Sequence, residues 1–248
     1  MELAEKYRIA EFLDTANDFL CSGYRTRRVE YNFEDDASLI NNAESRAVSR
    51  SERHSGDSLE NIAAEIKACK NCPLHEKRMN AVPGEGVIAP VVMVIGEGPG
   101  EDEDKQGRPF VGKAGQLLDK MLDSIGLSRD KNAFIANTVK CRPPLNREPR
   151  TEETEACSRF LIRQIELLKP KYILAAGRIS AHALLKTSDP INKTRGSFTT
   201  FSSGEFTCQL LVTYHPAALL RSEDLKRPAW EDLKLLRSKL DTNAEPEN

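Results

Sequence analysis

The sequence lacks an excess of positive charge: its 248 residues hold 36 Lys and Arg against 38 Asp and Glu. A formal net charge of -2 excludes the class of strongly basic domains that bind nucleic acid by bulk electrostatics, so any such binding needs a local basic patch. The acids are concentrated at the start. Residues 1–60 carry 8 basic and 13 acidic side chains, which leaves 28 basic and 25 acidic ones for a slightly basic main body.

The sequence also lacks an apolar run long enough to span a membrane, and its first residues, MELAEKYRIA, lack the charged-then-apolar pattern of a secretory signal. We therefore expect a cytoplasmic protein with no membrane contact. Cysteine is scarce, with six in the chain. In an intracellular protein, cysteines are better candidates for metal ligands or reactive thiols than for disulfide partners.

The pattern along the chain divides it into three parts. Apolar residues at helical spacing predict a helix over 3–20, and a polar stretch without a period predicts a flexible linker up to residue 57. Residues 58–241 are predicted to form the main domain and residues 242–248 a disordered tail. The acidic extension 1–57 is a candidate site for a protein partner.

The main domain alternates between strand and helix patterns. Short apolar runs predict four strands, and between them lie helical patterns, preceded by a helix that Ser58 caps. This alternation predicts an α/β fold, with a parallel sheet covered on both faces. The predicted strands cover 91–95, 133–138, 172–176 and 209–213, and the predicted helices cover 58–69, 114–125, 151–168, 179–185 and 228–240.

Residues that could bind a ligand or take part in catalysis cluster where the predicted strands end. GEGPG follows the first strand, Asn137 closes the second, Gly177 follows the third and His215 follows the fourth. Ligands bind at the carboxyl ends of the strands in open parallel sheets, so we expect one pocket to gather these residues. The acidic run GEDED next to it is expected to be a solvated loop.

Each candidate side chain has a functional and a purely structural interpretation. Glu97 either orients a water molecule or caps amides in its turn, and Phe110 either stacks on a planar ligand or anchors its loop. Asn137 either reads a base edge with its amide or closes its own turn. His215 either stabilises an anion on a leaving group or is a capping or core histidine. The basic residues around PPLN either clamp phosphates or are solvated charges; they are Lys140, Arg142, Arg147 and Arg150.

Four of the cysteines are placed to share a site. Cys69 and Cys72 form a CxxC at a helix end, Cys141 follows the second strand, and Cys157 lies in the helix that starts near Thr151. Four thiolates select zinc or an iron-sulfur cluster, and the spacing does not decide between them. The alternative is four buried cysteines acting as small apolar residues. Cys21 and Cys208 are interpreted as structural.

Taken together, the motifs GEGPGEDED, GRPFVGKAGQLL, NTVKCRPP, KTRGSF and YHPAALLR resemble the family 4 uracil-DNA glycosylases, over about residues 59–240. The resemblance implies a three-layer α/β/α fold with a four-stranded parallel sheet. It also implies a structural [4Fe-4S] cluster held by Cys69, Cys72, Cys141 and Cys157. The expected reaction is hydrolysis of the bond between uracil and deoxyribose, in single- or double-stranded DNA.

The same resemblance assigns roles to the pocket residues. Phe110 would stack on flipped uracil, and Asn137 would bond to its pairing edge and reject cytosine. The backbone at Gly98 and Pro99 would hold a uracil carbonyl, and His215 would stabilise negative charge on O2. Gly98 stands where the wider superfamily has a water-activating Asp, so Glu97 is the candidate for positioning water.

Two other functions compete with this interpretation. One is an iron-sulfur module of the same fold that binds nucleic acid without cleaving it. The other is a zinc-stabilised α/β hydrolase that acts on a free nucleotide. Whichever function applies, we expect the protein to be a monomer.

Overall fold

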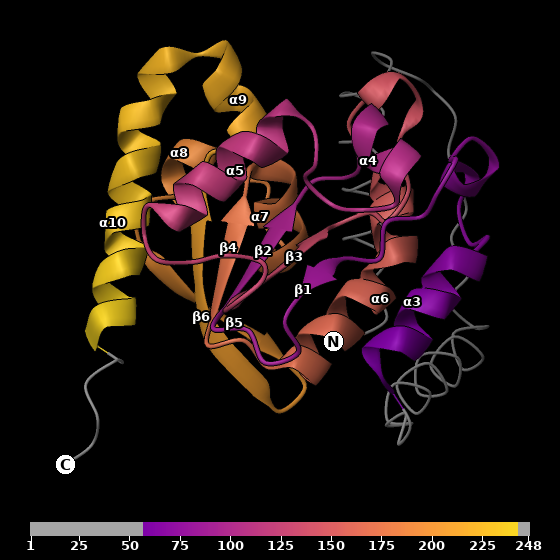
Figure 1. Cartoon of the computed structure of the whole chain (residues 1–248), viewed down its shortest axis with the longest axis horizontal. Coiled ribbons are helices and arrows are strands. Elements are labelled where there is room, and N and C mark those ends of the chain that lie inside the picture. The colour runs from indigo at the N-terminus through magenta and orange to yellow at the C-terminus, as the bar shows by residue number, and fades with distance from the viewer. Residues whose placement is uncertain (1–56, 243–248) are drawn as a thin grey trace, which may run out of the picture. The chain divides into compact units, whose positions relative to one another are not determined.

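A computed structural model of the chain describes residues 57–242 (Figure 1). The predicted N-terminal helix, the linker up to residue 56 and the tail beyond residue 242 lie outside these residues. The described part begins where a helix was expected. The hydroxyl of Ser58 accepts a hydrogen bond from the Asn61 amide at 3.1 Å and caps helix α3, Leu59–Ala68, as predicted.

A six-stranded sheet forms the centre of the domain, in the order β1-β3-β2-β4-β6-β5. The four inner strands are parallel, and each edge strand is antiparallel to its neighbour. The four predicted strands are confirmed, and they are the inner ones. The strands are β1 (Glu85–Gly86), β2 (Val92–Gly96), β3 (Ala133–Asn137), β4 (Tyr172–Ala176), β5 (Phe198–Ser203) and β6 (Phe206–Thr213).

The expected four-stranded parallel sheet is confirmed as the central part of a larger sheet, which has one additional antiparallel strand at each edge. Strand β1 is two residues long, too short to give a periodic signal. Strand β5, with the sequence FTTFSS, has one buried residue, Phe201, and otherwise polar or partly exposed side chains. Edge strands of this kind are short or polar because their outer side faces water, so they lack the apolar run that marks an inner strand.

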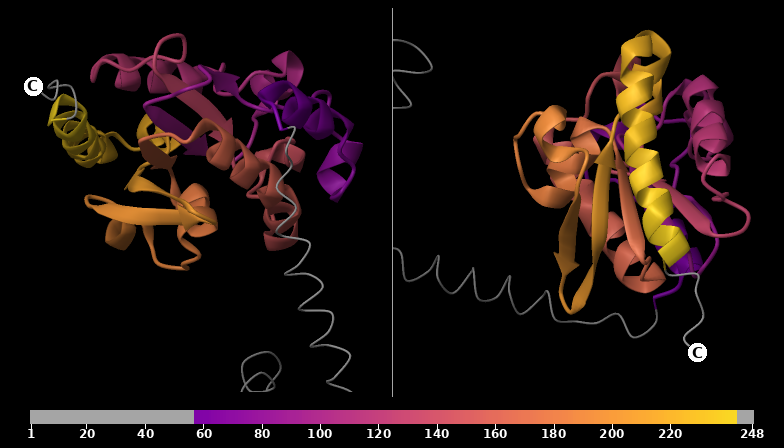
Figure 2. Two further views of the ribbon diagram at one scale, coloured as in Figure 1. Left: turned by 90° about the horizontal axis from the view of Figure 1, so that it is seen from below. Right: turned by 90° about the vertical axis from the view of Figure 1, so that its left-hand side faces the viewer.

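Helices cover both faces of the sheet, which makes the three layers that the resemblance implies (Figures 1 and 2). In β2, Val92 and Val94 pack with residues of α5 and α10, whereas Met93 and Ile95 pack with residues of α6 and α7. Alternate residues of a strand point to opposite faces, so a strand buried on both sides must be apolar throughout. The helices are α4 (Glu101–Gln106), α5 (Lys113–Asp123), α6 (Thr151–Leu168), α7 (Arg178–Leu185), α8 (Ile191–Thr194), α9 (Pro216–Arg221) and α10 (Lys226–Thr242), with short 3-10 turns at Pro73–Glu76, Pro144–Asn146 and Glu223–Leu225.

The order of the inner strands creates a switch point at the end of β2. The chain leaves β2 for β3 on one side, and then crosses through α6 to β4 on the other side of β2. The connections on either side of such a strand diverge, which leaves a crevice at its carboxyl end. Gly96 and Glu97 occupy this position.

A third apolar cluster joins α3 to the rest of the domain. Ile62 and Ile66 of α3 pack with Phe160 of α6 and with the buried cysteines Cys141 and Cys157. Between residues 57 and 242, no helix is long and apolar enough to cross a membrane.

Candidate active site and metal centre

A cavity of about 420 Å³ lies at the carboxyl ends of the inner strands. Its size is within the usual range for small-molecule sites. It brings together the six residues expected to bind substrate or act in catalysis, although they come from four separate segments. These residues are Glu97, Gly98 and Pro99 after β2, Phe110 before α5, Asn137 at the end of β3 and His215 after β6.

Asn137 offers an acceptor that has no partner. Its side chain is 1% exposed, and its Oδ1 is buried without a hydrogen bond in the described part of the chain. A buried amide oxygen without a partner costs about 1–3 kcal/mol, so such atoms are rare outside binding sites. Gly96 makes room for it, because a Cβ at Gly96 would lie 2.5 Å from both Asn137 Oδ1 and the ring of Phe110.

Phe110 is held in a strained backbone conformation. Its φ is +52°, a left-handed value that costs a bulky residue about 1–3 kcal/mol. Arg129 braces the loop by donating to the carbonyl oxygens of Pro109 and Phe110 at 3.0 and 2.9 Å. The ring of Phe110 lines the cavity, with its centroid 5.5 Å from that of the His215 imidazole and the two planes 31° apart.

Glu103 connects the two loops that border this cavity. Its carboxylate accepts hydrogen bonds from the amides of Gly100 at 3.0 Å, Val111 at 2.8 Å and Gly112 at 2.9 Å. It therefore fixes the segment that carries Phe110. The sequence analysis missed this role, although an acid at the third position of a helix is a recognised capping signal.

The expectation of a solvated GEDED loop is wrong. Residues Glu101–Gln106 form helix α4, in which Asp104 is buried and accepts from the amides of Met79 and Asn80 at 2.9 and 3.3 Å. Four acids in the first turn complement the positive end of the helix, which explains why so charged a stretch is helical.

His215 is neutral at pH 7 and has a defined tautomer. Burial in the cavity wall lowers its pKa to about 4, with a further contribution from the positive charge of Arg221. Its Nδ1 accepts a hydrogen bond from the Ala217 amide at 3.2 Å, so the proton of the neutral ring lies on Nε2. Gly177 packs against this side chain. Its φ is +108°, and a Cβ added there would lie 3.0 Å from His215 Cβ.

A buried ion pair fixes the strand end from which His215 leaves. Asp232 of α10 has a fully buried side chain, and Arg195 donates to its two oxygens at 2.7 and 3.0 Å. The same carboxylate accepts from the Thr213 hydroxyl at 2.8 Å, two residues before His215. Helix α10 and the end of β6 are therefore held together by a contact between distant segments, which could not be predicted from the sequence.

Glu97 lies half-buried in the cavity wall. Burial raises the pKa of its carboxyl group, and the negative charge of Glu148 raises it further, against the opposing charges of Arg178 and Arg221. Glu97 lines the same cavity as His215.

Two basic residues near the cavity loops are not available as phosphate contacts. Lys140 is 1% exposed and donates to Gln164 Oε1 at 2.7 Å, and Arg195 is paired with Asp232. Arg147 lines the cavity but is bonded to Glu153 at 2.6 and 2.8 Å. Arg221 also lines it, and its side chain forms no hydrogen bond or ion pair within residues 57–242. Arg221 is therefore the basic side chain best placed to meet an anion at this cavity.

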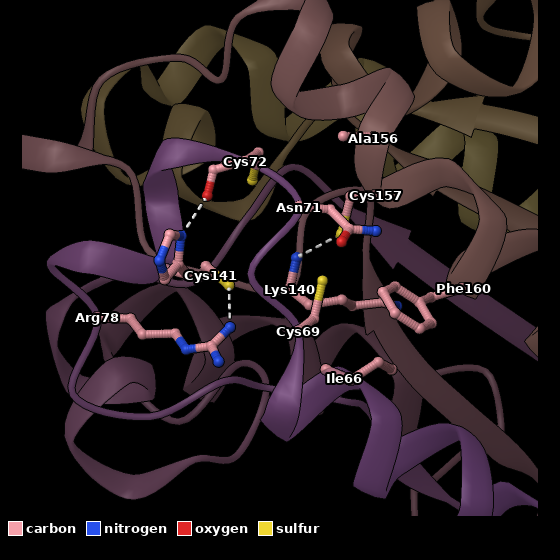
Figure 3. Close-up of a pocket in the computed structure, with 11 residues that line it drawn as sticks. Ile66, Cys69, Asn71, Cys72, Arg78, Lys140, Cys141, Ala156, Cys157 and Phe160 are labelled. Atoms are coloured by element: carbon pink, nitrogen blue, oxygen red, sulfur yellow. Dashed lines mark hydrogen bonds between the residues drawn. The ribbon is translucent and has the colours of Figure 1, made fainter.

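The four predicted cysteines line a second, small cavity (Figure 3). Cys69 and Cys72 reach it from the segment after α3, Cys141 from the segment after β3, and Cys157 from α6. Its other lining includes the apolar side chains of Ile66 and Phe160. The fifth described cysteine, Cys208, lies on β6 in the core between the sheet and α6, as a structural residue would.

Nitrogen donors point at two of these sulfur atoms. Arg78 Nη1 donates to Cys141 Sγ at 2.9 Å, and the Lys140 amide donates to Cys157 Sγ at 3.3 Å (Figure 3). Burial raises the pKa of the Cys157 thiol to about 11. Soft metals bind thiolates, and donors of this kind stabilise metal-bound sulfur, so the residues present fit a thiolate-held group.

Within residues 57–242, no group of three or more His, Cys, Asp or Glu side chains is arranged to hold a metal ion.

The first cavity can bind a flat heterocycle. An aromatic face, an amide with an open acceptor and an imidazole N–H line it together, beside a carboxylate. This set can stack on a ring, read its hydrogen-bonding edge and stabilise a negative charge on one of its oxygens.

Comparisons with known proteins agree with this arrangement. The family model of the Uracil DNA glycosylase superfamily matches residues 83–234. A type-4 uracil-DNA glycosylase of Pyrobaculum aerophilum is 47% identical over 174 residues, which cover 68% of this chain and 88% of that protein. Another type-4 enzyme, of Thermotoga maritima, is 42% identical over 183 residues, covering 73% of this chain and 93% of that protein. A type-5 uracil-DNA glycosylase of Pyrobaculum aerophilum is 33% identical over 156 residues, covering 56% of this chain and 66% of that protein.

Proposed function

Because the chain belongs to the uracil DNA glycosylase superfamily, among its type-4 enzymes, it is a DNA repair hydrolase that releases uracil, and we propose that the cavity at the strand ends does this work. The observation that carries the proposal is the open acceptor of Asn137 beside Phe110 and His215. Membership of this family of hydrolases argues against both the non-cleaving module and the hydrolase of free nucleotides.

Asn137 and Phe110 recognise the base. Uracil presents an N3–H donor next to its O4 acceptor, so Asn137 Oδ1 accepts from N3–H while Nδ2 donates to O4. Cytosine has the reverse pattern, so the amide oxygen of Asn137 would face an acceptor and its NH2 group would face a donor. Phe110 stacks on the flipped ring, since the base must leave the duplex to reach the cavity. The backbone at Gly98 and Pro99 lies against its carbonyl edge.

His215 stabilises the leaving group. As the bond between C1′ and N1 breaks, uracil keeps the electron pair and negative charge develops on O2. The neutral His215 ring donates from Nε2 to that oxygen, because Nδ1 is already an acceptor. A donor fixed before the reaction stabilises the developing charge without reorganisation.

Glu97 positions the water that completes the reaction. The oxygen of this water bonds to C1′ of the oxocarbenium-like sugar, and its proton passes through the Glu97 carboxylate to the solvent or the uracil anion. The product is an abasic site and free uracil, with no strand cleavage. The enzyme is therefore monofunctional.

Cys69, Cys72, Cys141 and Cys157 would hold a [4Fe-4S] cluster, which would supply a structural crosslink and no redox step. The four residues join α3, the segment after β3 and α6. The similarity to type-4 enzymes supports the cluster over a zinc ion.

A cleavage assay tests the function directly. The substrate is an end-labelled single strand with one uracil, and alkali converts abasic sites into breaks. We expect a break at uracil only after alkali, and none in matched strands that carry cytosine or thymine. An intact, iron-loaded protein that leaves the uracil strand whole would contradict the proposal.

The pH dependence of the cleavage rate distinguishes the role of Glu97 from that of His215. Glu97 has a raised pKa and must be ionised to act, so the rate falls as the pH drops through that pKa. His215 has a pKa of about 4 and stays neutral above that pH. We expect Glu97→Gln to be about tenfold slower at pH 7.5, because a dissociative reaction depends less on the base, and to lose the acidic limb that Glu97 causes. An unchanged acidic limb in the variant would assign that titration to another group.

Glu103→Ala is expected to weaken both stability and catalysis. Three backbone amides lose their acceptor, which lowers the free energy of unfolding by about 1–3 kcal/mol and releases the Phe110 loop. The measurement is KM and kcat on the uracil strand together with urea unfolding. The control is Asp102→Ala, an exposed acid on the same helix. Equal behaviour of the two variants would show that Glu103 does not position Phe110.

The remaining features concern partners and location. The enzyme acts as a monomer on single- and double-stranded DNA, and the acidic residues 1–57 are the segment for a protein partner. A cluster held by thiolates fits a reducing compartment, which supports a cytoplasmic protein. Sedimentation of the full chain and of a chain lacking residues 1–57 would test the monomer.

A further inference from the structure

Lys140 is the one lysine or arginine within residues 57–242 that is buried, at 1% exposed. It comes directly before Cys141 in the chain. An ammonium group is costly to bury unless a group of opposite charge accompanies it, so such lysines are rare. Neither the recognition of the base nor the hydrolysis described above uses this side chain.

The hydrogen bond of Lys140 fixes its position without compensating its charge. Its Nζ donates to Gln164 Oε1 at 2.7 Å, and Gln164 Nε2 donates to the Pro83 carbonyl oxygen at 2.8 Å, which sets the orientation of the amide. The amide oxygen is a neutral acceptor and takes one of the three N–H donors of the ammonium group. A buried cation also requires a negative charge nearby.

The buried acids of the described part do not supply that charge. Each is held elsewhere, either by backbone amides or by an arginine, and none lines the cysteine cavity to which Lys140 contributes. These acids are Asp104, Glu153 and Asp232. The negative partner of Lys140 must therefore come from the cysteines.

Two cations lie against these cysteines (Figure 3). The Lys140 amide donates to Cys157 Sγ at 3.3 Å; burial raises the pKa of that thiol, and the positive charge of the Lys140 side chain opposes the rise. Arg78 Nη1 donates to Cys141 Sγ at 2.9 Å. The cavity is thus lined by four thiols, two cations and no acid.

We propose that Lys140 and Arg78 neutralise the negative charge of the thiolate-held cluster, and so set how tightly it is bound and at what potential it is reduced. This inference rests on the proposed [4Fe-4S] assignment. Four thiolates outweigh the positive charge of such a core, so the group they hold is a net anion. A buried anion and a buried cation each need a partner, and here each supplies the other's.

The test uses the iron-loaded full chain and measures the rate of iron loss to a chelator and the midpoint potential of the cluster. Lys140→Met keeps a long side chain and removes its charge, so we expect iron loss to be about tenfold faster. A nearby cation favours the more negative, reduced state, so the potential should fall. A tenfold change in that equilibrium corresponds to about 59 mV for a one-electron couple.

Arg78 provides a second test that does not depend on a core substitution, because its side chain is only partly buried. Arg78→Met should lose iron faster and have a lower potential, as Lys140→Met does. Arg78→Lys keeps the positive charge and should restore most of both properties.

Two controls separate charge from packing. Gln164→Met removes the hydrogen bond of Lys140 but keeps its charge, so the potential should match that of the wild type. Lys70→Met removes an exposed positive charge between Cys69 and Cys72. Water and salt screen this charge, so iron loss should stay within about twofold of the wild-type rate.

Wild-type iron loss and potential in Lys140→Met and Arg78→Met would overturn the charge balance and leave the cluster and the glycosylase function in place. An equal fall in potential in Gln164→Met would also overturn it, because the hydrogen bond would then be the cause. A wild-type protein that holds no iron overturns the cluster assignment along with it, so the failures are distinguishable.

Discussion

Replacing His215 with alanine is expected to lower the single-turnover rate of uracil release by about 10²- to 10³-fold at pH 7.5. The imidazole is neutral, its Nδ1 is occupied by the Ala217 amide, and its Nε2–H is the donor left for uracil O2. Alanine removes this donor without adding a competing group. Substrate binding should change little, because Phe110 and Asn137 still hold the base.

The measurement is the rate of abasic-site formation with enzyme in excess, on a single strand with one uracil. His182→Ala is the matched control, since His182 bonds to the Asp189 carbonyl oxygen and does not line the cavity. We expect this control to keep the wild-type rate, and Glu97→Gln to lose less than His215→Ala. Comparable rates for His215→Ala and the wild type would contradict the assigned role.

Removing one cluster ligand is expected to have the largest effect on stability. Cys157→Ala should abolish iron binding and lower the free energy of unfolding by about 4 kcal/mol or more, a fall in Tm of about 10 °C for a domain of this size. The physical reason is the small size of the apolar cluster between α3 and α6. Without the crosslink, α3 is held to α6 by this small cluster and by the ion pairs of Arg163 with Asp57 and Glu65.

Cys208→Ala is the control for this variant. Both thiols are 8% exposed, but Cys208 lies on β6, away from the cysteine cavity. It should keep its iron and lose only the stability expected of a small core truncation. Iron and sulfide analysis, visible absorption and thermal unfolding measure the difference, and hydrogen exchange should rise first in α3. Iron retained by Cys157→Ala, or zinc in the wild type, would contradict the [4Fe-4S] assignment.

The difference between the expected and the observed basic surface has a physical cause. Four basic residues around PPLN looked equivalent in the sequence, yet Lys140 is buried under the cysteine cavity. Its pKa falls to about 8 because burial disfavours the charged form. Lysine is almost never fully buried, so no rule based on residue type predicts this position.

The sequence by itself determined the inner architecture. Strands buried on both faces must be continuous apolar runs, so β2, β3, β4 and β6 could be located from composition. The carboxyl ends of parallel strands meet at one edge, so Asn137 and His215 could be expected in the same cavity. The Ser58 cap could also be predicted, because the signal for a helix cap lies within four adjacent residues.

Only the tertiary structure decided the features that depend on long-range contacts. The edge strands β1 and β5 exist because a neighbour supplies hydrogen bonds, and their own side chains carry little pattern. The tautomer of His215 follows from a turn and its low pKa from burial, and the strand end before it is held by the hydrogen bond from Thr213 to Asp232 of α10. Local pattern fixes which elements form, whereas the charge state and direction of a side chain depend on everything packed around it.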